Sequence, residues 1–475
     1  MPRSRSRLAP AYLANALALA AVSAAACAPL PVPGSAARAQ TPEARADAAI
    51  KTAMAEGPFP GISVAVARGG KIIYQRGFGV ADRDGGTAVT PETRFPIGSI
   101  TKPVTCLAVL QLVGKGRVAL DAPAGRYLPD LPEPSRGVTV RQLLEHTAGV
   151  PNYLENPDFP YGKPVGFTRK DMLGFFADKP LMFPAGTRFN YSNSDTYLLG
   201  LIAEAASGDS YDGYVAANIF KPFGMTHSDF GASSVRASGY LSRGGAYRAA
   251  PAYDWLVPFS AGAIVSTSGD LVRFSQGLFG GKTPAKVRNM ALSGDKLEDG
   301  SANAYLQGCL IAGDLDGKRK YSHPGSIYGF SSHLAYYPDD RLTVVVLTNS
   351  QGERYPPLTL EHRIARIFLG LPEPDLTATP FDAAEAAWIA GDYRITNRRL
   401  GFEALGFVVR DGALQLSYGG AASGAPLVPL TALGGGRYVS TLDSEQIFAF
   451  TRAADGSVTL TMRYYDADFP MRKAG

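Results

Sequence analysis

Hydrophobic and polar positions follow two different periods along the first 370 residues. Residues 62–68 and 71–76 are short and rich in residues that favour strands, and Gly69-Gly70 between them predicts a hairpin turn. From Ser99 to about residue 113, apolar residues recur at the spacing of a buried helix. Further helical patterns, several of them preceded by a capping Thr, cover residues 42–56, about 139–146, 172–176, 195–206, 211–220 and 270–279.

Strand patterns return at the end of this region. Residues 332–337 and 342–349 predict a second hairpin through Pro338-Asp339-Asp340, and a helix follows near residues 360–369. Two strands, then helices, then strands again are typical of an α+β fold. We expect strands from both ends of the segment to form one antiparallel sheet, with an all-helical region packed around it.

The pattern changes near Leu371-Pro372-Glu373-Pro374. After Trp388 come short alternating stretches separated by Gly, Asp or Asn, which predict a small all-β barrel or sandwich. The sequence thus divides into a leader over residues 1–39, an α+β domain over 40–375 and a β domain over 380–475. The stretches of the last domain are residues 391–395, 402–409, 413–418, 427–430, 437–439, 446–451 and 458–464.

The leader has the layout of a secretory signal. Three arginines precede an apolar run over residues 12–26, which is short for a membrane span. Ala37-Arg38-Ala39 offers a cleavage site before Gln40. Cleavage at a second site, before Cys27, would produce a lipidated N-terminus. We take this as the secondary interpretation, and only in this case would the protein be attached to a membrane. We expect an exported protein, periplasmic or extracellular.

Charge and cysteine content exclude some classes of function. Of the formal charge of +5, four units come from arginines before residue 40, which leaves +1 and no dense basic patch. Nucleic acid is therefore not an expected partner. Of the two cysteines beyond the leader, Cys106 lies in an apolar helical pattern and is expected to be a small core residue, and the wide spacing from Cys309 is not that of a disulfide scaffold.

Ser99-Ile100-Thr101-Lys102 is an S-x-x-K motif, which brings a hydroxyl and an amine to one face of a helix. A serine needs a base to take its proton, and a lysine can accept one only when desolvation or a nearby cation lowers its pKa. A second copy, Ser293-Gly294-Asp295-Lys296, lies in a polar stretch without an apolar helix and is interpreted as a chance match in a loop.

Two further segments carry groups that suit the same chemistry. Tyr191-Ser192-Asn193 offers a phenol beside the lysine and an amide for a substrate carbonyl, although Asn193, Ser194 or Asp195 would also cap the next helix. His323-Pro324-Gly325-Ser326 suits an edge strand, because Pro324 cannot donate to a ladder, and Gly325 would let a substrate approach the backbone. The alternative for the second segment is a turn with a surface histidine.

Ser-x-x-Lys, Tyr-x-Asn and a basic-x-Gly element, in that order, resemble the serine β-lactamase and DD-peptidase superfamily, most of all class C β-lactamases, family VIII esterases and D-aminopeptidases. The stretch 143–149, Leu-Leu-Glu-His-Thr-Ala-Gly, is similar to a family motif, as are segments at 260–271 and 323–330. The resemblance covers about residues 43–370. The last domain resembles the lipocalin-like barrels appended to some such hydrolases.

The resemblance implies a role for each motif residue. Ser99 would be acylated, Lys102 and Tyr191 would relay the proton, and Tyr191 would activate water for deacylation. Backbone N–H groups of Ser99 and Ser326 would form an oxyanion hole. Asn193 and His323 would bind substrate. His146 and Thr147 are implied to be structural, and no metal or organic cofactor is required.

His323 departs from the lysine usual at this position, so a permanent charge that could hold a substrate carboxylate is missing. We therefore expect an amide or ester hydrolase (D-aminopeptidase, esterase or DD-peptidase-like) acting on a small molecule or short peptide, including fragments of peptidoglycan. The alternatives are a class C-like β-lactamase and a non-catalytic sensor that binds penicillins or cell-wall fragments. A further alternative is that the last domain binds an apolar ligand. The sequence contains no G-x-S-x-G elbow, which an α/β-hydrolase would need, and no H-E-x-x-H motif of the kind that zinc hydrolases use.

Overall fold

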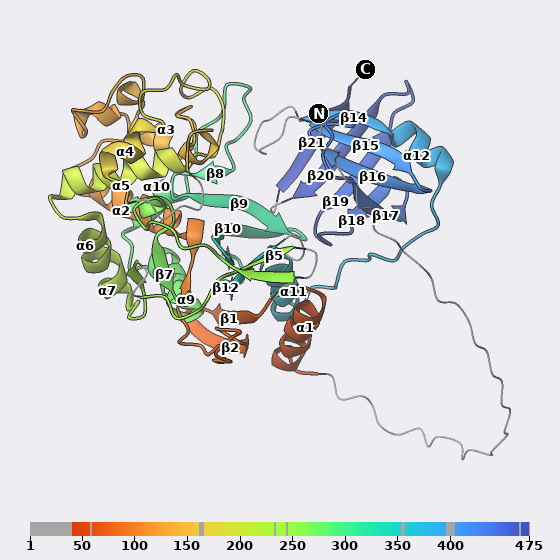
Figure 1. Cartoon of the computed structure of the whole chain (residues 1–475), viewed down its shortest axis with the longest axis horizontal. Coiled ribbons are helices and arrows are strands. Elements are labelled where there is room, and N and C mark those ends of the chain that lie inside the picture. Colours follow the sequence, from red (N-terminus) through yellow and green to blue (C-terminus); the bar gives the residue numbers. More distant parts are fainter. Residues whose placement is uncertain are drawn as a thin grey trace, which may run out of the picture. The chain divides into compact units, whose positions relative to one another are not determined.

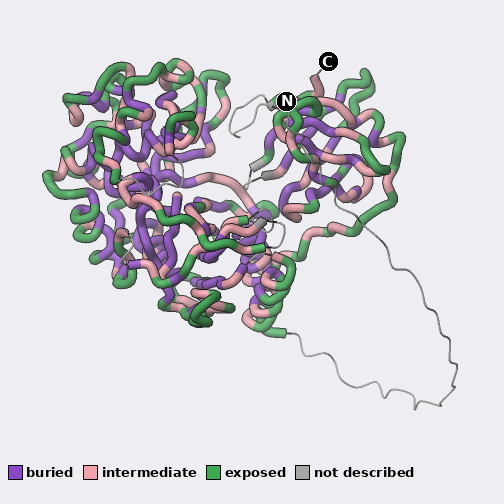
Figure 2. Tube along the Cα trace, viewed as in Figure 1, coloured by how far each residue is buried: buried purple, intermediate pink, exposed green. Residues whose placement is uncertain are grey.

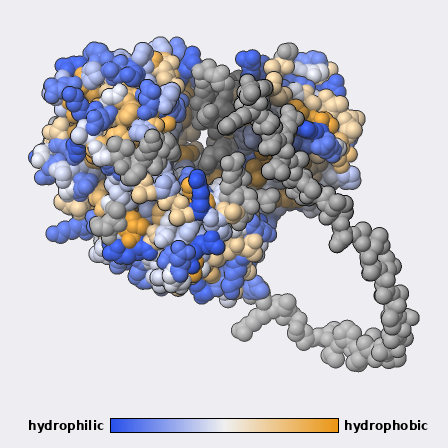
Figure 3. Space-filling model, viewed as in Figure 1, coloured by the Kyte–Doolittle hydropathy of each residue, from blue (hydrophilic) through white to orange (hydrophobic). Residues whose placement is uncertain are grey.

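A computed structural model describes residues 40–57, 59–160, 166–231, 234–243, 246–352, 357–395, 404–464 and 467–474. The expected secretory signal and the alternative lipidation site at Cys27 lie outside the described residues. Among the helices of the described residues, none has the length and apolar character needed to cross a bilayer. Figure 3 shows hydrophilic residues over much of the visible face, interspersed with smaller apolar areas.

One seven-stranded sheet forms the centre of the first domain (Figure 1). Its strands come from both ends of the segment, as expected, because β1 pairs antiparallel with β12 as well as with β2. In spatial order the strands are β2 (Lys71–Gly79), β1 (Gly61–Arg68), β12 (Leu342–Thr348), β11 (Phe330–Tyr337), β10 (Lys318–Ile327), β9 (Leu310–Leu315) and β8 (Tyr305–Leu306).

Strands β1 and β12 are buried on both faces. In β1, Val64 lies in the hydrophobic core with α1 (Pro42–Glu56) and α11 (Pro357–Leu369), whereas its neighbour Ala65 lies in the core on the opposite face, where α2 and α9 pack. Alternate side chains of a strand point to opposite faces, so burial of both faces requires an unbroken apolar run. Figure 2, read with the labels of Figure 1, shows β1 and β12 as buried.

Helix α2 (Thr101–Gly114) is the central helix of the helical region. Almost all of its residues are buried, and it packs against α5 and α8. Because α2 is covered on almost every side, its sequence is mostly apolar and has no broad polar face. The helices around it are α3 (Val140–Leu144), α4 (Arg169–Gly174), α5 (Asn193–Ser207), α6 (Tyr211–Val215), α7 (Lys221–Phe223), α8 (Phe259–Gly262), α9 (Ser268–Phe279) and α10 (Ala285–Ala291).

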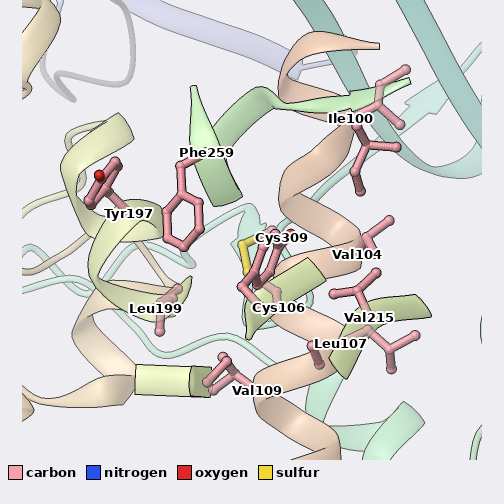
Figure 4. Packing of buried hydrophobic residues seen from close by; sticks show 14 of the residues in the cluster. Ile100, Val104, Cys106, Leu107, Val109, Tyr197, Leu199, Val215, Phe259 and Cys309 are labelled. Atoms are coloured by element: carbon pink, nitrogen blue, oxygen red, sulfur yellow. A yellow bond between two sulfur atoms is a disulfide. The ribbon is translucent and has the colours of Figure 1, made fainter. Parts of the chain in front are cut away.

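A disulfide joins Cys106 of α2 to Cys309 in the turn before β9, among buried apolar side chains (Figure 4). Cys106 is fully buried, as the apolar pattern predicts, but its pairing was not foreseen. The two residues are 203 positions apart, and only the packing of α2 against the end of the sheet brings their Cα atoms to 5.9 Å.

Short elements complete the first domain. The expected helix over 211–220 is divided, because a π-helical turn follows α6 at Ala216–Phe220. Two small sheets lie outside the main sheet. Their strands are β3 (Phe95–Pro96), β7 (Ile264–Ser266) and β4 (Asp229–Phe230) in one, and β13 (Ser350–Gln351), β5 (Tyr240–Arg243) and β6 (Ala246–Ala249) in the other.

The C-terminal segment folds into a closed eight-stranded barrel, preceded by α12 (Ala383–Ile389). Aromatic and aliphatic side chains such as Phe407, Tyr438 and Phe450 fill its interior. Sequence patterns missed the last strand, because Pro470 interrupts it. The strands are β14 (Gly391–Ile395), β15 (Ala404–Arg410), β16 (Ala413–Tyr418), β17 (Val428–Gly434), β18 (Arg437–Ser440), β19 (Ile447–Arg452), β20 (Val458–Tyr464) and β21 (Ala467–Lys473).

Candidate active site

The first turn of α2 brings Ser99 and Lys102 together. Ser99 lies in a 3₁₀ turn, Gly98–Ile100, that leads directly into the helix, and Lys102 lies one turn later on the same face. The Lys102 Nζ lies 3.1 Å from the Ser99 Oγ. Ser99 is half-buried, whereas Lys102 is 0% exposed. The hydroxyl is therefore accessible while the amine beside it is sealed from water.

The contacts of Lys102 suit an uncharged amine. Its Nζ donates to Asn193 Oδ1 at 2.8 Å and to the Ala261 carbonyl at 2.9 Å. A neutral amine has two N–H groups for these acceptors, and its lone pair is then left to accept the Ser99 O–H. Burial lowers the pKa of Lys102 well below its usual range, and the nearby Asp195 opposes that shift. The site therefore favours a lysine that can accept a proton.

Tyr191 and Asn193 lie at the start of α5 and face the same amine. The Tyr191 ring centre is 4.8 Å from the Lys102 Nζ. Burial raises the pKa of Tyr191 and a hydrogen bond with Ser99 only partly opposes it, so its neutral phenol is favoured. The expected capping by this segment is wrong: the N-cap is Ser192, whose side chain makes no capping bond, and Ser194 instead donates to the Pro151 carbonyl.

Strand β10 carries the third predicted segment. Its residues 318–322 pair with β9, whereas the residues from His323 onward pair only with β11. Pro324 therefore lies where one edge of the strand is free, as predicted. A Cβ on Gly325 would lie 2.1 Å from the Ile97 carbonyl oxygen, and one on Gly98 would lie 2.8 Å from the Ser326 nitrogen. Two glycines thus permit the close approach of β10 to the turn that holds Ser99.

A cavity of about 630 Å³ opens at this junction. Ser99, Asn193 and Ser326 all line it, so the structure brings together residues from the turn before α2, from α5 and from β10. Gln351 also lines the cavity, and its Nε2 donates to the Ser326 Oγ at 2.9 Å. Apolar wall residues include Leu154, Val257 and Pro258, and Tyr153 and Tyr328 add aromatic surface.

His323, which the resemblance implies to bind substrate, is buried outside the cavity rather than in its wall. It is 1% exposed and does not line the cavity. Its Nδ1 lies 2.6 Å from the Pro324 carbonyl oxygen and its Nε2 lies 2.9 Å from the Tyr305 hydroxyl. Burial, and then the nearby Lys102, lower its pKa to about 3. His323 is consequently a neutral, buried partner of Tyr305, and direct contact with substrate is not available to it in this structure.

Further residues complete the site. Arg248, on β6, lines the cavity together with Gln351. His146 is fully buried, and its Nδ1 lies 2.8 Å from Asp195 Oδ2. Its ring centre is 4.8 Å from that of Tyr191. His146 belongs to the stretch 143–149, which identified it as structural, but nothing in the sequence pairs it with Asp195.

The second S-x-x-K copy is a loop, as interpreted. Ser293 Oγ donates to the Met290 carbonyl at 2.8 Å, and Lys296 forms an isolated bridge with Ala302. Neither residue lines the cavity that holds Ser99. The S-x-x-K motif alone therefore does not distinguish the two copies. What distinguishes them is the apolar helix that follows Ser99.

Known proteins of several kinds resemble this chain. Protein flp of Staphylococcus aureus is 29% identical over 331 residues, which are 66% of this chain and 64% of that protein, so the chain spans less than two thirds of its length. The putative penicillin-binding protein PbpX of Bacillus subtilis is 28% identical and is matched over 60% of this chain and 70% of its own.

Solved structures support the same assignment. The octameric penicillin-binding protein homologue from Pyrococcus abyssi is 27% identical with a TM-score of 0.61, over 90% of this chain and 99% of its own. The penicillin-binding protein from Bacillus halodurans is 30% identical with a TM-score of 0.55, over 65% and 95%. The profile of the beta-lactamase family matches residues 46–366, well over half of the sequence. This chain belongs to the beta-lactamase family, in the superfamily of serine β-lactamases and DD-peptidases.

Proposed function

We propose that the protein is an exported serine hydrolase that forms an acyl-enzyme on Ser99 and cleaves an amide or ester bond. The observation that carries the proposal is the contact of Ser99 Oγ with a buried Lys102 amine whose two N–H groups already have acceptors. Such an amine is a base placed beside the Ser99 hydroxyl.

Acylation follows from this geometry. The Ser99 Oγ bonds to the substrate carbonyl carbon as its proton passes to Lys102. The negative charge that develops on the carbonyl oxygen would be stabilised by the backbone N–H groups of Ser99 and Ser326, which the two glycines bring close. Breakage of the C–N or C–O bond then returns the proton, through Lys102 and the Tyr191 phenol, to the leaving group.

Deacylation reverses the roles. A water molecule gives its proton to the neutral amine–phenol pair, its oxygen bonds to the acyl carbon, and the bond to Ser99 breaks with return of the proton to Oγ. The resemblance assigns the activation of water to Tyr191. Because burial favours the neutral phenol, we assign Lys102 as the acceptor and Tyr191 as the group that passes the proton on.

Export is supported by two independent features. The leader has the layout of a secretory signal. The disulfide between Cys106 and Cys309 suits an oxidising compartment, because thiols are kept reduced in the cytosol of most organisms.

The cavity favours substrates that carry a carboxylate. Arg248 lines it, and no Asp or Glu does among the residues that the structure describes. A free amine on the substrate would need an acidic partner, whereas a carboxylate would find the Arg248 guanidinium. Arg248 thus offers the charge that His323 does not, which favours a carboxypeptidase-like or penicillin-recognising activity over an aminopeptidase.

The experiment that tests the proposal is intact-mass analysis of the mature protein after exposure to a fluorophosphonate and, separately, to a fluorescent penicillin. Both probes should add mass to the wild type and to Ser293→Ala, the matched change in the second S-x-x-K copy, and neither should label Ser99→Ala. Labelling by the fluorophosphonate alone would keep the nucleophile and move the substrate towards esters or small peptides. Failure of both probes to label Ser99 would favour the non-catalytic sensor.

A further inference from the structure

The barrel carries a second cavity, of about 600 Å³, between the end of α12 and strands β19 to β21. Three cationic side chains line it, those of Arg452, Arg472 and Lys473, together with the Trp388 ring. No Asp or Glu appears among the described residues of the lining. All the charged side chains among the described lining residues are therefore cationic.

These cations lack the ion pairs found elsewhere on the barrel. Arg463, on β20, lies 3.2 Å from Asp314 and 3.5 Å from Asp468. Within the described residues, neither Arg452 nor Arg472 forms an ion pair, and Lys473 Nζ donates to the Trp388 carbonyl at 2.7 Å. The one nearby carboxyl in the β19–β20 turn, Asp455, accepts instead from Ser457.

The strands add like charges rather than separating them. Arg472 of β21 is paired in register with Arg394 of β14, so two guanidinium groups emerge from directly opposed positions. Like charges at opposed positions destabilise a sheet. Burial, and then the charge of Arg452, lower the pKa of Lys473. Among the described residues of the lining, no carboxylate offsets these charges.

We propose that this cavity is a binding site for a phosphate-bearing anion. A phosphate group carries enough charge to neutralise the cations that line this cavity, and guanidinium forks bind its oxygens in pairs. Lys473 keeps two N–H donors after its bond to Trp388, and the indole gives an apolar surface for the rest of the ligand. The site is independent of Ser99 and gives the barrel a function that its packed interior does not.

Titration of the mature protein with pyrophosphate by isothermal calorimetry, at constant ionic strength, tests the proposal. The wild type should bind, and Arg452→Gln and Arg472→Gln should each weaken binding about tenfold or more. Arg410→Gln removes the same charge from the same barrel outside the cavity and should leave binding unchanged. Equal weakening by all three changes, or no binding by the wild type, would overturn the proposal.

A second experiment distinguishes a lipid headgroup from a soluble phosphorylated ligand. Sedimentation with phosphatidylglycerol vesicles, but not with phosphatidylcholine vesicles, and its loss in Arg472→Gln would identify a lipid headgroup. Binding of pyrophosphate without sedimentation would identify a soluble phosphorylated ligand. Melting temperatures of all variants, measured without ligand, show that each is folded, and the removal of like charge should leave them equal to or above that of the wild type.

Discussion

His146 Nδ1 lies 2.8 Å from Asp195 Oδ2 in a pair that water does not reach. Burial raises the pKa of Asp195 well above its usual range and lowers that of His146 well below, so both groups favour their neutral forms. The Asp195 O–H then donates to His146, and the Ser192 backbone N–H approaches the same nitrogen at 3.4 Å. A neutral pair leaves Lys102 without a buried counter-charge, which is the setting that its uncharged amine requires.

Asp195→Asn should therefore leave the pH dependence of acylation unchanged, because an amide N–H replaces the carboxyl O–H as donor to His146. The measurement is the rate of labelling by a fluorophosphonate between pH 5 and 9. A midpoint displaced to lower pH in the variant would contradict this, since it would mean that an Asp195 carboxylate keeps Lys102 protonated in the wild type. Asp195→Leu, which removes the donor, should cost about 1–3 kcal/mol of stability.

Lys102 should govern the acid limb of activity. Its amine must be neutral to accept the Ser99 proton, so the labelling rate should rise with pH through the depressed pKa of Lys102 and level off above it. Lys102→Arg keeps a charge at all working pH values and should lower the rate roughly 10²- to 10⁴-fold. Lys296→Arg, in the second S-x-x-K copy, is the control. A Lys102→Arg variant that kept the wild-type rate would remove Lys102 from the mechanism.

Arg248 should determine substrate preference rather than rate. Arg248→Gln should raise KM for a carboxylate-bearing substrate roughly three- to tenfold at low salt, because an exposed guanidinium forms a screened charge-assisted contact. The kcat should stay unchanged. The matching substrate with its carboxylate converted to an amide supplies the control, and its KM should be the same for both proteins. A fall in kcat with both substrates would instead place Arg248 in the positioning of the acyl group.

The sequence predicted the parts of the site that depend on local pattern. Ser99 and Lys102 are three residues apart on one helix, and the apolar stretch after them predicts that their setting is buried. Strands β1 and β12 were predicted from their apolar runs. Pro324 correctly indicated a free strand edge, because a missing N–H has a local consequence.

The rest depends on contacts between distant segments. His323 is withdrawn from the cavity by Tyr305 on β8, and Cys106 meets Cys309 across 203 residues. Neither relationship has a period that a pattern could reveal. Arg248 lies on β6, a four-residue strand too short to give a periodic pattern in the sequence. Pro470 hid β21, although that strand pairs with β20 on one side and, over its last residues, with β14 on the other.

A buried ion network should make the protein sensitive to acid. Lys320 of β10 lies 2.7 Å from Glu361 of α11, and both are at most 1% exposed. His362 and Arg366, also on α11, contact Glu445 of the barrel. Burial alone would raise the pKa of both glutamates, but Lys320 and then His333 lower that of Glu361 to about 2, and His362 and Arg366 lower that of Glu445 to about 2.

Both glutamates have folded-state pKa values below their usual 4.5, so the stability that they contribute is fully present above that value and is lost as pH falls towards about 2. Each group should give a slope of about 1.4 kcal/mol per pH unit in that window. Urea unfolding at a series of pH values measures it. Glu361→Gln leaves Lys320 without its carboxylate and should cost about 3–5 kcal/mol at pH 7 while reducing the slope. The exposed control Glu92→Gln should change neither. If Glu361→Gln were as stable as the wild type at pH 7, the Lys320 charge would have to be absent or balanced by another group.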